Sequence, residues 1–119
     1  MEITKVANRI QKIIQAIGEE RRALRDAGQK KAKAISNYDR ALQIKIMELS
    51  QGTAKDDNGE PVPKPPASYT EKIAKGLCWQ ERLELEQADG AYKAVISNLE
   101  ALKAQLNGYQ SIFRHLEET

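Results

Sequence analysis

Apolar residues recur at alternating steps of three and four through the C-terminal half of the chain. The series is Leu85, Ala88, Tyr92, Val95, Leu99, Leu102, Leu106, Tyr109, Phe113 and Leu116. This spacing is typical of a helix that buries one stripe against a partner helix. The series keeps its phase through Gly90 and Gly108. We therefore expect both glycines to lie inside the helix, although each costs about 1 kcal/mol relative to alanine there.

The N-terminal half carries the same spacing with one shift of phase. The first run is Ile3, Val6, Ile10, Ile13 and Ile17, and the second is Ile35, Tyr38, Leu42, Ile46 and Leu49. Between them the stripe is interrupted by Glu20 and Lys31, and it resumes one position later. Such a stutter changes the supercoil locally without ending the helix. Because no proline occurs before residue 61, the pattern predicts one helix over 2–51.

A loop rich in proline and glycine separates the two halves. Residues 52–67 contain four prolines and an Asn-Gly pair, which are turn-forming residues. The segment Pro63–Pro66 has the PxxP spacing, which either presents a polyproline II element or stiffens the turn. We expect the second helix over 69–117. Ser68 and Glu71 have the spacing of a capping box, and a break in this helix is expected near Gly76.

The two apolar stripes agree on one point at which the chain folds back. If they pair antiparallel, Ile3 lies opposite Leu116, and the bulky Tyr92 lies opposite the small residues Ala27 and Gly28. These pairs are symmetric about a point between residues 59 and 60, inside the loop. The sequence therefore predicts an all-α fold, with residues 1–119 forming a single long antiparallel helical hairpin, or coiled coil.

Several apolar residues flank the stripes and would stay outside a two-helix seam. They are Ile14, Ile44, Met47, Ile73, Leu77, Ile96 and Ile112. A hairpin buries only one stripe per helix, which is little core for its length. These residues either shield the flanks of the seam or pack two hairpins into a four-helix bundle. We favour self-association as a homodimer.

Composition supports long helices and a cytoplasmic protein. The 119 residues are 40% hydrophobic, 5% aromatic and 30% charged, which is typical of coiled coils. The net charge of +2 does not point to nucleic acid or to a membrane surface. No stretch approaches the roughly 20 apolar residues that a membrane span requires. The N-terminus lacks a signal-peptide core, and the single cysteine, Cys78, cannot build a disulfide framework.

Residues that carry catalytic or metal chemistry are scarce. His115 is the only histidine, and Cys78 has no second cysteine or nearby histidine to complete a zinc site. Neither a phosphate-binding loop nor a dinucleotide fingerprint occurs. We expect no enzyme activity, no cofactor, no metal and no small-molecule substrate. Cys78 is expected to be a small buried apolar residue.

Six basic residues crowd the middle of the first predicted helix. They are Arg21, Arg22, Arg25, Lys30, Lys31 and Lys33. All but Lys31 span about half of the helix circumference, and such a face could bind phosphates or an acidic protein surface. Alternatively they form a solvated face, or pair with Glu81, Glu84, Glu86 and Asp89, which the register places nearby. Trp79 and His115 are further candidates for contact with a partner, although Trp79 could instead pack at the loop end of the hairpin.

The closing phrase of the chain, Leu-Asn-Gly-Tyr-Gln-Ser-Ile-Phe-Arg-His-Leu over 106–116, carries a resemblance. With the preceding part of the C-terminal half, it resembles small helical, coiled-coil proteins encoded by phages and prophages. The resemblance transfers no catalytic or binding motif. It implies the cytoplasm of a bacterial host and a phage or host macromolecule as partner.

Three functions are compatible with these observations. The leading hypothesis is a non-catalytic protein–protein interaction module, a phage-encoded inhibitor or adaptor that docks on a host or phage macromolecule. The second is a nucleic-acid-binding accessory of phage replication or recombination that uses the six basic residues. The third is a structural scaffold for assembly.

Overall fold

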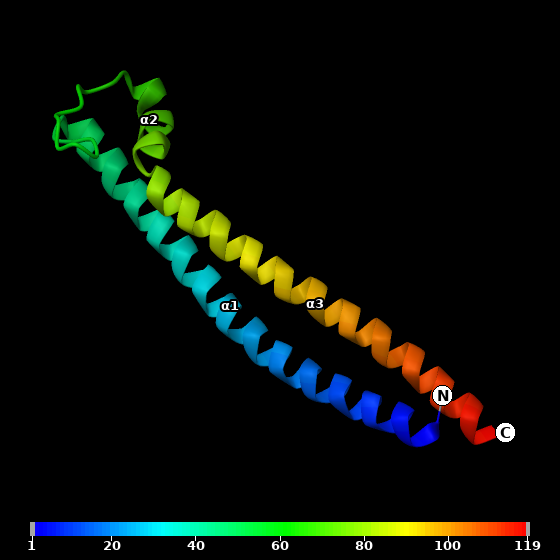
Figure 1. Ribbon diagram of the computed structural model, residues 1–119. Coiled ribbons are helices and arrows are strands. Elements are labelled where there is room, and N and C mark those ends of the chain that lie inside the picture. Colours follow the sequence, from blue (N-terminus) through cyan, green and yellow to red (C-terminus); the bar gives the residue numbers. More distant parts are fainter. Residues whose placement is uncertain (1, 119) are drawn as a thin grey trace. The chain divides into compact units, whose positions relative to one another are not determined.

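The computed structural model describes residues 2–118, and its ordered elements are helices. In chain order they are α1 (Ile3–Gln51), the 3-10 helix η1 (Ala67–Tyr69), α2 (Thr70–Leu77) and α3 (Trp79–Glu118) (Figure 1). Within this part of the chain the only β pairing is an isolated bridge between Lys55 and Pro61. The predicted all-α antiparallel hairpin is confirmed. It contains two compact units: unit 1 combines residues 1–29 with 90–119, and unit 2 is residues 30–89.

Unit 1 pairs the beginning of α1 with the end of α3 along the predicted seam. Its core is formed by Ile13, Ile17 and Leu99. Partly buried side chains pack around this core: Leu24, Val95, Leu102, Leu106 and Tyr109. Gly90 and Gly108 lie inside α3, as the uninterrupted phase predicts. Spacing by threes and fours therefore identified the residues that face each other in this unit.

Unit 2 contains the end of α1, the loop, α2 and the beginning of α3. Its buried core combines residues of α1, the loop, α2 and the junction before α3: Tyr38, Leu42, Leu49, Ala54, Ala74 and Cys78. Leu85 of α3 packs against this core. Val62 of the loop packs against the same core. The loop is thus part of the packed structure, and Cys78 is buried as predicted.

The loop leaves α1 and reverses direction through two glycines with positive φ. Gly52 (φ 75°) donates its N–H to the carbonyl of Leu49, and the next amide, that of Thr53, donates to the carbonyl of Glu48. These two bonds form a Schellman motif, which ends the helix. At the tip, the Asp56 carboxylate accepts the amides of Asn58 and Glu60, each at 2.9 Å.

The start of α2 differs from the prediction of a capping box. Ser68 belongs to η1, and Tyr69 is the N-cap residue without a side-chain hydrogen bond. The 3-10 turn already uses the amides of Tyr69 and Thr70, which donate to the carbonyls of Pro66 and Ala67.

The break between α2 and α3 lies at Cys78, two residues beyond Gly76. Gly76 remains inside α2, whereas Cys78 has φ −96° and ψ 29°. Hydrogen bonds continue across the break, since Cys78 donates its N–H to Ala74 and accepts from the N–H of Arg82, each at 3.0 Å. The helix therefore changes direction without leaving amides unpaired, and it does so at a residue buried in the core of unit 2.

Candidate functional site

The basic residues of α1 differ in their surroundings. In unit 1, Arg21, Arg22 and Arg25 are exposed, and none forms an ion pair with another described residue. In unit 2, Lys30 and Lys33 are exposed, whereas the half-buried Lys31 places its Nζ 3.0 Å from Oδ1 of Asp89. An ion pair with a carboxylate of the second helix was one of the predicted alternatives for the six basic residues. Such a pair is formed by Lys31.

Trp79 combines a contact with the loop and an exposed ring. Its indole Nε1–H donates a hydrogen bond to Oδ2 of Asp57, yet half of the residue is exposed (50%). Leu83, one helical turn later, is also 50% exposed. Because Cys78 and Leu85 pack into the core of unit 2, Trp79 and Leu83 lie on the outward face of α3. Trp79 therefore contacts the loop, as one of its two predicted roles requires, and its role as a contact for a partner stays a prediction.

The beginning of α3 is acidic. Residues 79–89 contain four carboxylates and one basic residue, a net charge of −3. The basic residue, Arg82, forms an ion pair of 2.9 Å with Glu86, and its guanidinium lies 5.6 Å from the centre of the Tyr38 ring. The exposed apolar pair Trp79 and Leu83 thus lies on an acidic segment, in which Glu86 and Asp89 are each paired with a basic residue.

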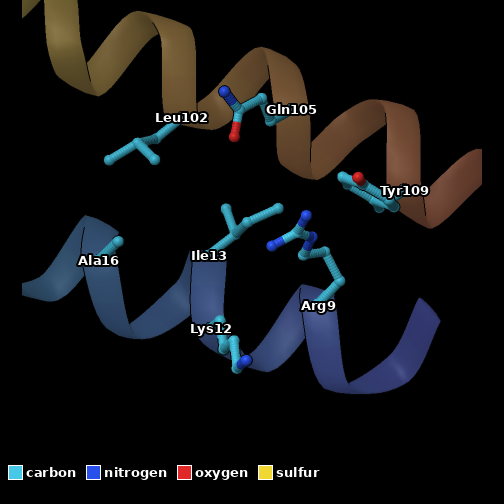
Figure 2. A pocket seen from close by; sticks show the side chains of 7 residues that line it. All are labelled: Arg9, Lys12, Ile13, Ala16, Leu102, Gln105 and Tyr109. Carbon is cyan, nitrogen blue, oxygen red and sulfur yellow. The ribbon is translucent and has the colours of Figure 1, made fainter. Parts of the chain in front are cut away.

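Three adjoining hollows follow one side of unit 1, two of them between α1 and α3 and one on α1 alone. The largest of the three, about 480 Å³, is lined by Arg9, Lys12, Ile13, Ala16, Leu102, Gln105 and Tyr109 (Figure 2). A second hollow shares Ala16 and Leu102 with the first and adds Glu19, Glu20, Asn98 and Ala101. A third shares Arg9 and Lys12 and adds Lys5 and Asn8. We refer to these three adjoining hollows as the unit 1 groove.

The unit 1 groove is basic at one end and acidic at the other. Lys5, Arg9 and Lys12 line the first end, and Glu19 and Glu20 line the second. The residues that α3 contributes to these hollows are all uncharged. Oε2 of Glu20 is buried and has no hydrogen-bond partner among the described residues. This groove was not predicted from the sequence, although the order of charges along α1 is a signal for it.

The remaining groups with reactive side chains are separated from one another. His115 is exposed in the last turn of α3, where a basic side chain is favourable near the helix dipole. Burial, and next the carboxylate of Glu81, raise the pKa of the Cys78 thiol. Among residues 2–118, no group of three potential metal ligands lies together.

No helix in the same range combines the length and the apolar character needed to cross a membrane.

The predicted partner residues thus fall into separate places. Arg21, Arg22 and Arg25 form an exposed basic segment, Trp79 belongs to an exposed apolar pair, and His115 lies alone at the end of α3. Comparisons of this chain with known protein families, with curated proteins and with solved structures give no match.

Proposed function

We propose that this chain is a non-catalytic protein–protein interaction module that docks the outward face at the start of α3 into a groove on another protein. The observation that carries the proposal is the exposure of Trp79 and Leu83, half of each residue, one helical turn apart. Apolar residues at this spacing are what a helix uses when it binds in a groove. Tryptophan is among the residues that contribute most to binding energy at interfaces.

The environment of Trp79 favours tight binding. Its hydrogen bond to Asp57 restrains the indole before any partner arrives. A side chain that is already ordered loses less conformational entropy on binding, and this saving amounts to about 0.5–1.5 kcal/mol for a flexible side chain. The pair is therefore better suited to contact than the exposed but flexible Met47 of α1.

The chemistry of the partner follows from the charge around the apolar pair. Because residues 79–89 carry a net charge of −3, the partner presents an apolar groove bordered by lysine or arginine. The resemblance to phage-encoded proteins supports a phage or host protein of the bacterial cytoplasm. A small helical protein that occupies such a groove acts as an inhibitor or an adaptor without chemistry of its own.

The test compares capture of bacterial proteins by three immobilised forms of the chain. These are the parent, the variant Trp79→Ala/Leu83→Ala, and the matched control Ile44→Ala/Met47→Ala, which removes exposed apolar residues from α1 of the same unit. Any captured protein is purified and titrated against all three. We expect the Kd to rise on the order of 100-fold for the first variant and to change little for the control. Equal affinity for all three forms would contradict the proposal.

A second candidate function rests on the three exposed arginines of unit 1. Arg21, Arg22 and Arg25 have no carboxylate partner among the described residues and are available to phosphates. A nucleic-acid-binding accessory would show affinity for DNA or RNA that falls steeply with salt. Unchanged affinity after replacing all three with alanine would exclude this function.

A further inference from the structure

Four charged residues recur at seven-residue intervals along α1 in unit 1. They are Lys5, Lys12, Glu19 and Asp26, in the order basic, basic, acidic, acidic. Residues seven apart lie on nearly the same side of a helix, with a drift of about 20° per interval. All four are exposed, and none forms an ion pair with another described residue. We call them the charged row.

The charged row borders the unit 1 groove. Lys5 and Lys12 line its basic end, and Glu19 lines its acidic end. The order of charges is antisymmetric about a point between Gln15 and Ala16. A second copy of α1 laid antiparallel about this point would place every basic residue of the row opposite an acidic one. A parallel copy in register would place like charges together, which is unfavourable.

We propose that two copies of the chain dock through the unit 1 groove with their α1 helices antiparallel. Lys5 of one copy faces Asp26 of the second, and Lys12 faces Glu19, with both pairs repeated by the twofold symmetry. The arrangement joins two helix pairs into a four-helix bundle and specifies which face and register the bundle uses.

The floor of the groove supplies an apolar contact for this pairing. Next to the basic end lie Ile13, Ala16 and Leu102 (Figure 2). Because Ile13 is already buried in the seam, Ala16 and Leu102 supply this contact. On the α3 side, Asn98, Ala101 and Gln105 add no charge that docking would have to desolvate. The small side chains of Ala16 and Ala101 allow a second helix pair to approach closely. Apolar burial thus supplies affinity, and the charged row selects the orientation.

Glu20 provides an independent observation at the acidic end of the groove. Its Oε2 atom is buried without a hydrogen-bond partner among the described residues, which is costly for a carboxylate. In the antiparallel arrangement, the basic end of the second copy, with Arg9 and Lys12, covers this position. Docking therefore brings positive charge near a carboxylate whose buried oxygen lacks a hydrogen-bond partner among the described residues.

This inference does not depend on the proposed function. The charged row belongs to unit 1 and recognises the same chain, whereas Trp79 and Leu83 belong to unit 2 and face a different protein. Self-association and partner capture are measured separately, so either can fail without the other.

Charge reversal within the charged row tests the pairing in the full chain. Lys5→Asp/Lys12→Glu makes the row entirely acidic, and Glu19→Lys/Asp26→Lys makes it entirely basic. The matched control, Lys103→Glu/Arg114→Glu, makes the same change in net charge as the first of these variants, with exposed residues of α3 that do not line the groove. The association of each form is measured by sedimentation equilibrium at low salt.

We expect each half-reversed variant to raise the dimer Kd on the order of 100-fold, because four attractive contacts become repulsive. An equimolar mixture of the two variants regains association as a heterodimer, and so does the chain with all four charges exchanged. This recovery shows that the variants are folded. A parent that stays monomeric at its highest soluble concentration would overturn the proposal, as would half-reversed variants that associate like the control.

Disulfide trapping tests the orientation. Asn8 and Ala23 are equally distant from the point between Gln15 and Ala16, so an antiparallel pair brings residue 8 of one copy beside residue 23 of the other. In a Cys78→Ala background, we expect Asn8→Cys mixed with Ala23→Cys to form a mixed disulfide. Asn8→Cys alone stays unlinked. Efficient linkage of Asn8→Cys to itself would indicate a parallel pair and contradict the proposed register.

Discussion

The ring of Tyr92 packs against Gly28 across the seam of unit 1. A Cβ atom added to Gly28 would lie 3.6 Å from Cε2 of Tyr92, which is an ordinary van der Waals contact. The pairing of Tyr92 with Gly28 was predicted from the antiparallel register of the two apolar stripes and is confirmed. At this level of the seam, α1 has room for one methyl group and not for a larger side chain.

Gly28→Ala should therefore stabilise the protein, and Gly28→Leu should destabilise it. Alanine favours a helix over glycine by about 1 kcal/mol, and its methyl group would touch Tyr92 without a clash. Leucine would have to displace the ring, at a cost of about 1–3 kcal/mol. Urea unfolding measures both changes. Gly90→Ala is the control, because nothing lies within 4 Å of its added Cβ. Its free energy of unfolding should rise by about as much as that of Gly28→Ala.

The fold was predictable because a two-helix seam leaves a periodic trace in the sequence. Ile13, Ile17 and Leu99 are buried where the spacing by threes and fours places them. The local details near the loop were not predictable in the same way. The helix breaks at Cys78, although Gly76 has the weaker helix propensity. The Cys78 side chain is buried in the core of unit 2, and its backbone N–H and carbonyl remain hydrogen-bonded across the break. The position of the break therefore follows tertiary packing and not local helix propensity.

The Lys31–Asp89 ion pair should contribute little to stability. Its atoms lie 3.0 Å apart, but the two side chains are 31% and 25% exposed, so solvent screens the attraction. We expect a coupling energy of no more than about 1 kcal/mol, which falls as salt is added. A double-mutant cycle with Lys31→Met and Asp89→Asn measures it. A coupling that is several times larger and insensitive to salt would contradict this view.

The candidate surfaces were only partly visible in the sequence. The six basic residues form an obvious cluster, yet composition alone does not distinguish Lys31, which pairs with Asp89, from the exposed Arg25. The exposure of Trp79 depends on the change of direction at Cys78 and on the hydrogen bond to Asp57, which no local pattern predicts. Contacts between distant residues decide which charges remain available.

Loss of the Asp57 carboxylate should change the fluorescence of Trp79. This residue is the only tryptophan, so the emission reports on its surroundings alone. In Asp57→Ala the indole N–H loses its partner, and we expect lower fluorescence anisotropy and a shifted emission maximum. Asp57→Asn keeps an acceptor oxygen and should resemble the parent more closely. The stability change should stay near 1 kcal/mol, since the hydrogen bond is exposed.

The buried thiol of Cys78 should make stability fall at alkaline pH. Burial raises the pKa of this thiol, so the folded-state pKa lies above that of the unfolded chain. The contribution of the neutral thiol is fully present below the unfolded pKa and is lost as the pH rises through the folded pKa. Tyrosines and lysines also titrate in this range. The observable is therefore the difference in unfolding free energy between the parent and Cys78→Ala, which should shrink from neutral to alkaline pH.

Two residues of α1, two positions apart, should differ sharply in how much their truncation destabilises the protein. Leu49 is fully buried in the core of unit 2, whereas Met47 is 60% exposed. Leu49→Ala removes apolar burial and leaves a cavity among residues from α1, the loop and α2, so we expect a loss of about 2–5 kcal/mol. Met47→Ala should change the free energy of unfolding by less than about 0.5 kcal/mol. Urea denaturation followed by circular dichroism measures both. The carbonyl of Leu49 also accepts a hydrogen bond from the N–H of Gly52 in the motif that ends α1. A small effect of Leu49→Ala would therefore mean that the loop is held by its backbone bonds and not by this core.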